Sequence, residues 1–123
     1  MTFSLLIVDD DEQFLEFVAG VVKVRYPGIV VQSARDGMEA LAIIKKGAPP
    51  DLVLTDMHMP RLDGNALCKS LREAYRKRIK VAVMTGNGNF DRQDFDAVLA
   101  KPFPIDALYK IIDDAKRTRG KKR

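Results

Sequence analysis

The sequence predicts one α/β domain in which helices cover both faces of a five-stranded parallel sheet. Five short apolar runs alternate along the 123 residues with segments that repeat apolar residues at helical spacing or carry turn signals. The first run, residues 4–8, is apolar almost throughout, as is typical of a strand buried on both faces of its sheet. Right-handed crossovers between successive parallel strands are therefore expected.

The expected elements follow in order from these runs and from the turn residues between them. The expected strands are residues 4–8, 29–34, 51–55, 79–84 and 97–100. Helices are expected over residues 11–25, from the Asp36-Gly37 turn to Gly47, from Asn65 as N-cap to about residue 76, and from 105 onward. Residues 86–96 are rich in glycine, asparagine and aspartate, so the fourth helix of such a fold should be shortened or irregular.

Composition and charge favour a globular cytoplasmic protein without a membrane partner. The chain is 46% hydrophobic, and no apolar run approaches the roughly 20 residues of a membrane span. Its start lacks the basic segment and cleavage site of a signal peptide. The single cysteine, Cys68, cannot form an internal disulfide, which is compatible with a reducing compartment. Its helical spacing with Leu67 and Leu71 predicts a packing role.

The end of the chain is strongly basic, and it divides the expected organisation in two. Residues 116–123 carry six basic and no acidic groups, although the net charge of the whole chain is only +4. We expect a domain over residues 1–115, followed by a basic tail or the start of a linker at 116–123. Basic residues are favoured at the C-terminal end of a helix, which predicts a solvated linker. Contact of this tail with nucleic acid is the alternative.

Polar groups follow the expected strands at the point where each strand ends. Asp9, Asp10 and Asp11 follow the first strand, whereas Asp56, Thr85 and Lys101 follow the third, fourth and fifth. The carboxyl ends of parallel strands meet at one edge of a sheet, where open α/β folds gather their functional groups. The sequence therefore predicts one site at this edge.

The residue types at this edge indicate phosphoryl chemistry on a carboxylate. The adjacent acids Asp9 and Asp10 repel one another unless a cation compensates, and Mg²⁺ prefers such oxygen ligands. The carboxylate of Asp56 can serve both as a metal ligand and as a nucleophile toward phosphorus. The Lys101 ammonium and the Thr85 hydroxyl would then surround the phosphoryl oxygens. The expected product is an aspartyl phosphate.

Five segments of the sequence form a specific combination of motifs. They are Ile7-Val8-Asp9-Asp10-Asp11, Asp36-Gly37-Met38-Glu39-Ala40-Leu41, Asp51-Leu52-Val53-Leu54-Thr55-Asp56-Met57-His58-Met59-Pro60-Arg61-Leu62-Asp63-Gly64, Met84-Thr85-Gly86 and Lys101-Pro102-Phe103. With this combination the sequence resembles a known family, the receiver domains of response regulators in bacterial two-component signalling. The resemblance covers essentially the whole chain up to the basic tail.

This resemblance implies specific roles. Asp56 would be the phosphorylation site, Asp10 a direct Mg²⁺ ligand, Asp9 a ligand through water or an orienting group, and the His58 backbone carbonyl a further ligand, with Mn²⁺ as a substitute metal. Thr85 and Lys101 would contact the phosphoryl oxygens, and the Lys101–Pro102 bond would be cis. The implied fold is flavodoxin-like and doubly wound, with strand order 2-1-3-4-5. The implied partners are a histidine kinase or histidine phosphotransfer protein and a downstream protein or fused effector domain.

The chain also departs from the family pattern. Only 15 residues separate Thr85 from Lys101, fewer than most relatives have. Val98 stands at the switch position where relatives often carry a rotating aromatic residue, and Phe90 or Phe95 are the candidates to replace it. Gly86 should leave room for the phosphoryl group. His58 and Asn87 are expected to flank the site and to modulate the lifetime of the phosphate.

Two rival functions fit part of the pattern. A metal-dependent phosphatase with an aspartyl nucleophile would use an Asp-x-Asp pair, which Asp9 and Asp11 formally supply, but the chain is short for a substrate pocket. A receiver-like binding module that is never phosphorylated is the second rival, against which the complete set of acids, threonine and lysine argues. A flavin-binding function fails because no Ser/Thr/Gly-rich loop follows the first strand.

Overall fold

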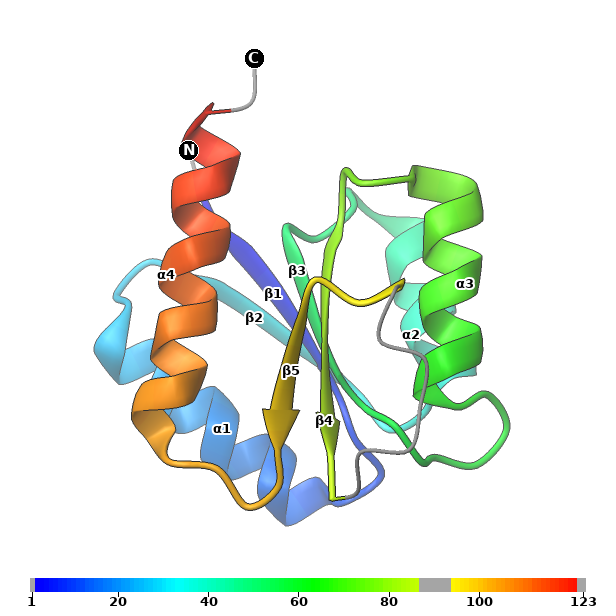
Figure 1. Ribbon diagram of the computed structural model, residues 1–123, viewed down its shortest axis with the longest axis horizontal. Helices are drawn as coiled ribbons and strands as arrows, with labels where there is room; N and C mark the ends of the chain where they lie inside the picture. The colour runs from blue at the N-terminus through cyan, green and yellow to red at the C-terminus, as the bar shows by residue number, and fades with distance from the viewer. Residues whose placement is uncertain (1, 87–93, 122–123) are drawn as a thin grey trace.

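The computed structural model describes residues 2–86 and 94–121, and within them five parallel strands form one sheet in the order β2-β1-β3-β4-β5 (Figure 1). The elements are β1 (Ser4–Val8), α1 (Glu12–Arg25), β2 (Val30–Ala34), α2 (Gly37–Lys46), β3 (Leu52–Asp56), α3 (Gly64–Tyr75), β4 (Lys80–Thr85), β5 (Ala97–Ala100) and α4 (Ile105–Lys121). The predicted fold class and strand order are confirmed. Strands β3 and β4 each end one residue later than predicted, so that Asp56 and Thr85 are their last residues.

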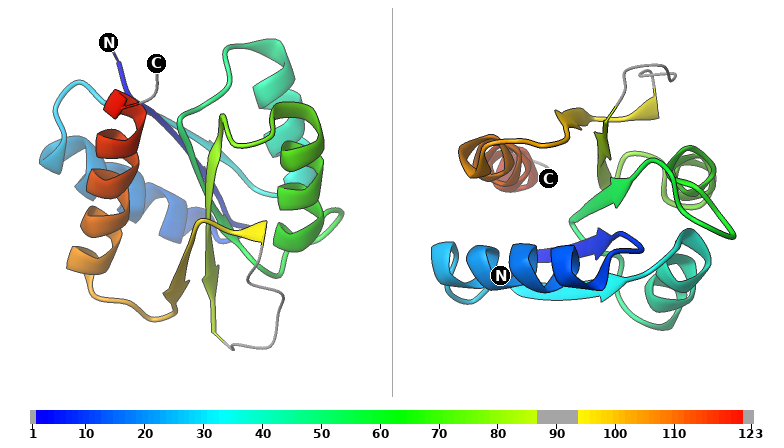
Figure 2. Two further views of the ribbon diagram at one scale, coloured as in Figure 1. Left: turned by 45° about the horizontal axis from the view of Figure 1, so that its top comes forward. Right: turned by 90° about the horizontal axis from the view of Figure 1, so that it is seen from below.

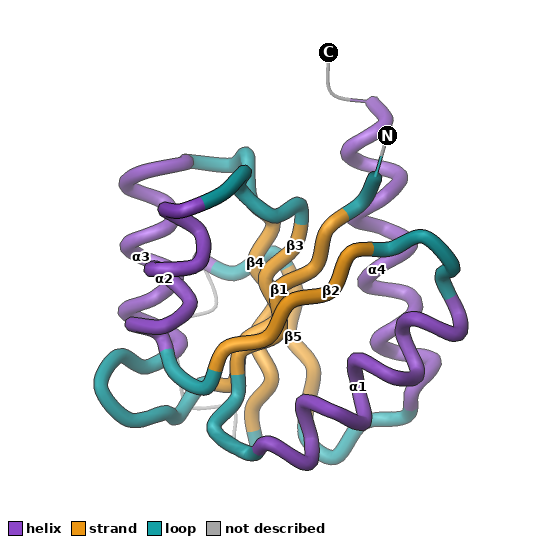
Figure 3. Tube along the Cα trace, turned by 180° about the vertical axis from the view of Figure 1, so that it is seen from behind, coloured by secondary structure: helices purple, strands orange, loops and turns teal. Residues whose placement is uncertain are grey.

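Helices α1 and α4 cover one face of the sheet, and α2 and α3 cover the other (Figure 2). Strand β1 contributes to both cores because successive side chains of a strand point to opposite faces. Leu5 and Ile7 pack in the core on the side of α1 and α4, whereas Leu6 and Val8 pack in the core on the side of α2 and α3. Strand β1 is therefore central, whereas β2 lies at one edge of the sheet (Figure 3).

Aspartates cap the three helices that follow β1, β2 and β3. Asp11 caps α1, Asp36 caps α2 and Asp63 caps α3, each accepting backbone N–H groups of the first turn. The prediction that Asn65 caps α3 is wrong, because this helix begins earlier, at Gly64. A Cβ on Gly64 would stand 2.5 Å from the Asp56 carbonyl oxygen, so only glycine allows this close start.

Strands β4 and β5 are joined without a helix among the described residues, and 87–93 lie outside them, including Asn87 and Phe90. The described part of this crossover is fastened to α3. The Arg72 guanidinium donates to the Asp94 carbonyl (Nη2, 2.8 Å) and to the Asp96 carboxylate (2.7 Å). The buried Cys68 thiol also lies 3.2 Å from the Asp94 carbonyl oxygen, and its burial raises the pKa of this thiol to about 11. The predicted packing role of Cys68 agrees with this position.

Helix α4 continues through residues 116–121, where the sequence turns basic. Its Arg119 donates to the Thr2 carbonyl (2.8 Å) and to the Asp51 carboxylate (3.1 Å), which ties the helix to the amino end of the sheet. The separate character of residues 116–123 stays a prediction. Over the described residues, no helix has both the length and the apolar character needed to cross a membrane.

Candidate functional site

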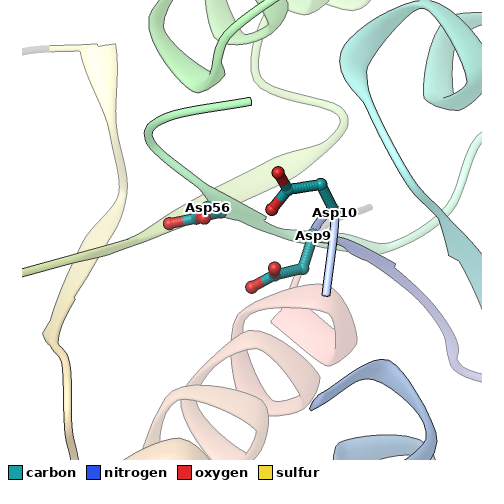
Figure 4. Close-up of side chains that lie close together, drawn as sticks. All are labelled: Asp9, Asp10 and Asp56. Atoms are coloured by element: carbon teal, nitrogen blue, oxygen red, sulfur yellow. The ribbon is translucent and has the colours of Figure 1, made fainter. Parts of the chain in front are cut away.

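Three carboxylates meet at the carboxyl edge of the sheet, as predicted. One oxygen each of Asp9, Asp10 and Asp56 lies within 4.8 Å of the others (Figure 4). The parallel register of β1 and β3 pairs Val8 with Thr55, so the residues that follow are brought side by side. Asp9 is buried, Asp56 is partly buried and Asp10 is exposed, so the cluster opens to solvent on one side.

Asp9 is held by two donors. Its Oδ2 accepts a hydrogen bond from Lys101 Nζ at 2.8 Å, and its Oδ1 accepts one from the Asp11 backbone N–H at 2.9 Å. The Asp11 side chain faces the other way, since it accepts from the backbone of Gln13 and Phe14 as the cap of α1. Asp9 therefore belongs to the site, whereas the Asp11 carboxylate is used by the helix.

Lys101 places an ammonium beside the cluster. Its Nζ lies 3.7 Å from Asp56 Oδ1 and 4.4 Å from the centre of the Phe14 ring, in addition to its contact with Asp9. Its backbone N–H donates to the Thr85 carbonyl at 2.8 Å, which aligns the ends of β4 and β5. The Lys101–Pro102 bond is cis, as the resemblance implied.

The environment of Asp56 disfavours its charge. Burial is the main cause that raises the pKa of this carboxyl; the Lys101 ammonium opposes the shift, and the nearby Asp9 and Asp10 add to it. One backbone N–H, that of Met57, donates to its Oδ1 at 3.0 Å. Within the described part of the chain, three acids lie beside one ammonium, which leaves excess negative charge that a divalent cation would relieve.

The remaining predicted residues lie around this cluster or beyond it. Thr85 is buried at the end of β4. Gly86 is exposed, and apart from its chain neighbours no atom of the described residues lies within 4 Å of the place where a Cβ would stand. The His58 side chain is exposed. Val98 is partly buried and packs against the core of α2 and α3, where Phe95 is also buried. Asn87 lies outside the described residues.

Two features of the site were missed from the sequence. Phe14 contacts Lys101, although its spacing indicated only core packing. Arg61 binds Asp36 through Nε at 2.9 Å and Nη2 at 3.1 Å, which joins the loop after β3 to the start of α2. Neither contact leaves a signal in the sequence, because each depends on residues far apart along the chain.

The donor set fits Mg²⁺. This ion favours carboxylate oxygens and keeps several waters, so it needs a site that is open on one side. Asp10, Asp56 and, directly or through water, Asp9 are the side chains that would hold it. Lys101 already neutralises part of the charge on Asp9. Among the described residues, no side chain donates a hydrogen bond to Asp10 or Asp56, which leaves these two acids for the metal.

Comparison with known protein families gives a match over most of the chain. The sequence profile of the response regulator receiver domain matches residues 5–113. Response regulator MprA of Mycobacterium ulcerans (strain Agy99) is 33% identical over 114 residues, which cover 88% of this chain and 47% of that protein. Transcriptional regulatory protein GlrR of Escherichia coli (strain K12) is 31% identical over 117 residues, which cover 90% of this chain and 26% of that protein. The chain thus spans about half the length of MprA and about a quarter of the length of GlrR.

Solved structures agree in fold. The receiver domain of the Francisella response regulator 1452 is 30% identical with a TM-score of 0.80, over 94% of this chain and 98% of that one. A CheY-like receiver domain protein from Methanospirillum hungatei JF-1 has a TM-score of 0.85 at 24% identity, over 99% of this chain and 100% of that one, which speaks for the fold.

Proposed function

Because the chain belongs to the receiver domains of response regulators, we propose that it accepts a phosphoryl group on Asp56 in a Mg²⁺-dependent reaction. The observation that carries the proposal is the meeting of three carboxylate oxygens within 4.8 Å, with Lys101 between Asp9 and Asp56. The donor would be a histidine kinase or a histidine phosphotransfer protein. The acceptor acts as a signalling protein that catalyses only its own phosphorylation and dephosphorylation.

The chemistry follows from the positions of the side chains. An oxygen of Asp56 attacks the phosphorus atom, the P–N bond to the donor imidazole breaks, and the imidazole nitrogen keeps the bonding electrons and takes up a proton. Bound Mg²⁺ would neutralise charge on the transferring group. The Lys101 ammonium, now 2.8 Å from Asp9, exchanges this contact for one with a phosphoryl oxygen, and the Thr85 hydroxyl donates to another.

Phosphorylation would shift an equilibrium between two conformations, because Lys101 and Thr85 interact differently with a carboxylate and with its phosphate. The segment after Thr85, including Gly86, is where this change begins. Asn87 and His58 would modulate the lifetime of the phosphate. Val98 would stand at the switch position without an aromatic ring. The output is a downstream protein or an effector domain of a longer cytoplasmic regulator.

The phosphatase alternative is less well supported. It needs the carboxylates of Asp9 and Asp11 in one site, but the Asp11 carboxylate caps α1. A binding module that is never phosphorylated would have no use for the Lys101 contact with two acids. Both alternatives predict no stable phosphoprotein.

Intact mass after incubation with acetyl phosphate, with and without Mg²⁺, tests the proposal. We expect one phosphoryl adduct that requires Mg²⁺ and is absent from Asp56→Asn. The matched control is Asp51→Asn, which changes the aspartate just before the same strand and should leave the adduct intact. An adduct that persists in Asp56→Asn would contradict the site, and no adduct from this donor or from candidate kinases would contradict the function.

A further inference from the structure

The loop of residues 57–63 connects the acid end of β3 to α3 and folds back onto that strand. The Gly64 N–H donates to the Met57 carbonyl at 2.8 Å, which closes the loop at its base. Asp56 stands at one end of this loop, and its own carbonyl is the atom that a Cβ on Gly64 would strike. The position of the loop therefore sets the position of one wall of the acid cluster.

An ion pair between Arg61 and Asp36, the clasp, joins the same loop to the start of α2. Arg61 presents Nε and Nη2 to the two carboxylate oxygens of Asp36, a paired geometry that favours one orientation. The Asp36 side chain is 13% exposed and is fixed as the cap of α2 by the Glu39 N–H at 2.8 Å. This N–H first, and Arg61 after it, lower the pKa of the Asp36 carboxyl, so the acceptor stays ionised. Arg61 thus binds an acceptor that is already in place.

The loop that the clasp holds contains a strained backbone conformation. Arg61 has a φ of 69°, a left-handed conformation that costs a non-glycine residue about 1 kcal/mol or more. The next residue, Leu62, accepts a hydrogen bond from the Gly37 N–H at 3.2 Å. A Cβ on Gly37 would lie 2.5 Å from that Leu62 carbonyl oxygen, so the approach requires glycine. The start of α2 is therefore shaped to receive this loop.

We propose that Arg61 is a positioning residue that sets the Mg²⁺ affinity of the site by holding loop 57–63 against the Asp36-Gly37 turn. The inference rests on the proposed function, since it requires Mg²⁺ at Asp10 and Asp56. Without the clasp, the loop spends less time in the arrangement that completes the site. The apparent dissociation constant rises by the inverse of the fraction that remains competent.

The sign of the effect separates positioning from simple electrostatics. Arg61 is a positive charge near an acid cluster, so its removal should by charge alone strengthen cation binding. Positioning predicts the opposite. Arg35 offers a matched control, because it precedes Asp36 in the sequence and its guanidinium pairs with Glu12 on the surface at 2.6 Å.

The test is a Mg²⁺ titration of the whole chain, followed by calorimetry or by backbone amide shifts, for the wild type, Arg61→Asn, Asp36→Asn, the double variant and Arg35→Gln. Asparagine tolerates the left-handed conformation at position 61 and can still cap α2 at position 36. We expect the dissociation constant to rise about 3- to 10-fold in Arg61→Asn, with no further rise in the double variant, and to stay equal or fall in Arg35→Gln. Unfolding midpoints without Mg²⁺ show whether each variant is folded; if Arg61→Asn is not, Arg61→Lys, which keeps the charge without the fork, should give a smaller rise.

Three outcomes overturn the inference. An unchanged or lower dissociation constant in Arg61→Asn, or in Arg61→Lys if that variant takes its place, would assign Arg61 no positioning role, while leaving the proposed function intact. Additive effects of Arg61→Asn and Asp36→Asn on the dissociation constant would show that the two residues act independently. The positioning role would then be wrong and the proposed function unaffected. A wild-type chain that binds no Mg²⁺ would overturn the inference together with the proposed function.

Discussion

Strand β3 has an aspartate near each end, Asp51 and Asp56, and the two carboxylates differ in the hydrogen-bond donors around them. Their side chains are similarly exposed, 23% for Asp51 and 18% for Asp56. Asp51 accepts from the Ser4 backbone N–H at 2.8 Å and from Arg119 at 3.1 Å, with the Ser4 hydroxyl at 3.4 Å. Among the described residues, Asp56 accepts a hydrogen bond from one backbone N–H, that of Met57. The nearest ammonium among them, that of Lys101, is 3.7 Å away and bound to Asp9.

The contrast distinguishes an acid that serves the fold from one that is kept for a ligand. Three donor groups from two segments of the chain, Ser4 and Arg119, surround the carboxylate of Asp51, so its charge is compensated within the fold. Asp56 sits beside two more acids, and burial together with their charge raises its pKa despite Lys101. A partly buried acid with a raised pKa in an open cluster is typical of a functional site.

The largest expected difference is in the phosphorylation rate after removal of the cation at each end of β3, Lys101 beside Asp56 and Arg119 beside Asp51. Lys101→Ala should slow phosphorylation from acetyl phosphate by about 100-fold, because a charge that stabilises the transferring group is lost. Its Mg²⁺ affinity should not fall, since the ammonium beside Asp9 and Asp56 repels a metal ion. Arg119→Ala is the control and should leave the rate unchanged. A large loss of Mg²⁺ affinity in Lys101→Ala, with an unchanged rate, would reverse the assigned roles.

Removal of the amino-end acid should affect stability but not chemistry. Asp51→Ala leaves the partly buried Ser4 N–H without its 2.8 Å acceptor, and this should lower the free energy of unfolding by about 2 kcal/mol. Denaturant titration measures the change, and phosphoryl adduct formation should match the wild type. An unaltered midpoint would mean that Asp51 is not a structural acid.

Removal of the carboxyl-end acid should have the opposite effect on stability. The pKa of Asp56 is higher in the folded than in the unfolded chain, so its ionisation opposes folding, and stability falls as the pH rises through the folded pKa. Asp56→Asn should therefore raise the unfolding free energy by about 1 kcal/mol near neutral pH without Mg²⁺, a gain within the usual range for such changes.

The pH dependence provides the check on this sign. The advantage of Asp56→Asn over the wild type should shrink toward zero as the pH falls below about 3, where the wild-type carboxyl is protonated in both the folded and the unfolded state. Thermal midpoints across this range would reveal it. An advantage that grows on acidification would show that the pKa is lowered, not raised.

The smallest expected effect concerns the loop after Asp56. The exposed imidazole of His58, the one histidine of the chain, lies two residues beyond the acceptor. His58→Ala should alter the lifetime of the aspartyl phosphate by a few-fold, roughly 1 kcal/mol or less in the barrier to hydrolysis. Decay of the phosphoprotein mass in Mg²⁺ measures it, with Lys45→Ala on the exposed surface of α2 as control. Identical decay of both variants and the wild type would leave His58 without a role.

Features that depend on local pattern were predictable from the sequence, and long-range contacts were not. The convergence of Asp9, Asp10 and Asp56 follows from the rule that parallel strands end at one edge, and the cis Lys101–Pro102 bond followed from the resemblance. The cap of α3 was misplaced because Gly64 approaches the Asp56 backbone, which spacing does not reveal.

The missed contacts share one physical origin. Arg61 reaches Asp36 across 25 positions, and the Arg72 guanidinium holds Asp94 across 22, where the family would place a helix. The shortage of residues between Thr85 and Lys101 did indicate an irregular crossover. The sequence does not indicate which side chain holds this crossover in place of a helix. An arginine at a polar position of α3, such as Arg72, has the same local pattern whether it contacts solvent or backbone carbonyls.

The hydrogen bond from Arg119 to the Thr2 carbonyl brings the two ends of the described chain together (Figure 1). They meet at the edge of the sheet opposite Asp56, about 16 Å away along a five-residue strand. Domains with adjacent ends tolerate insertion into other proteins. This domain could therefore be inserted into a loop of a host protein whose two ends lie close together, with junctions near Thr2 and Lys121. Its acid cluster, at the opposite edge of the sheet, would remain open to solvent.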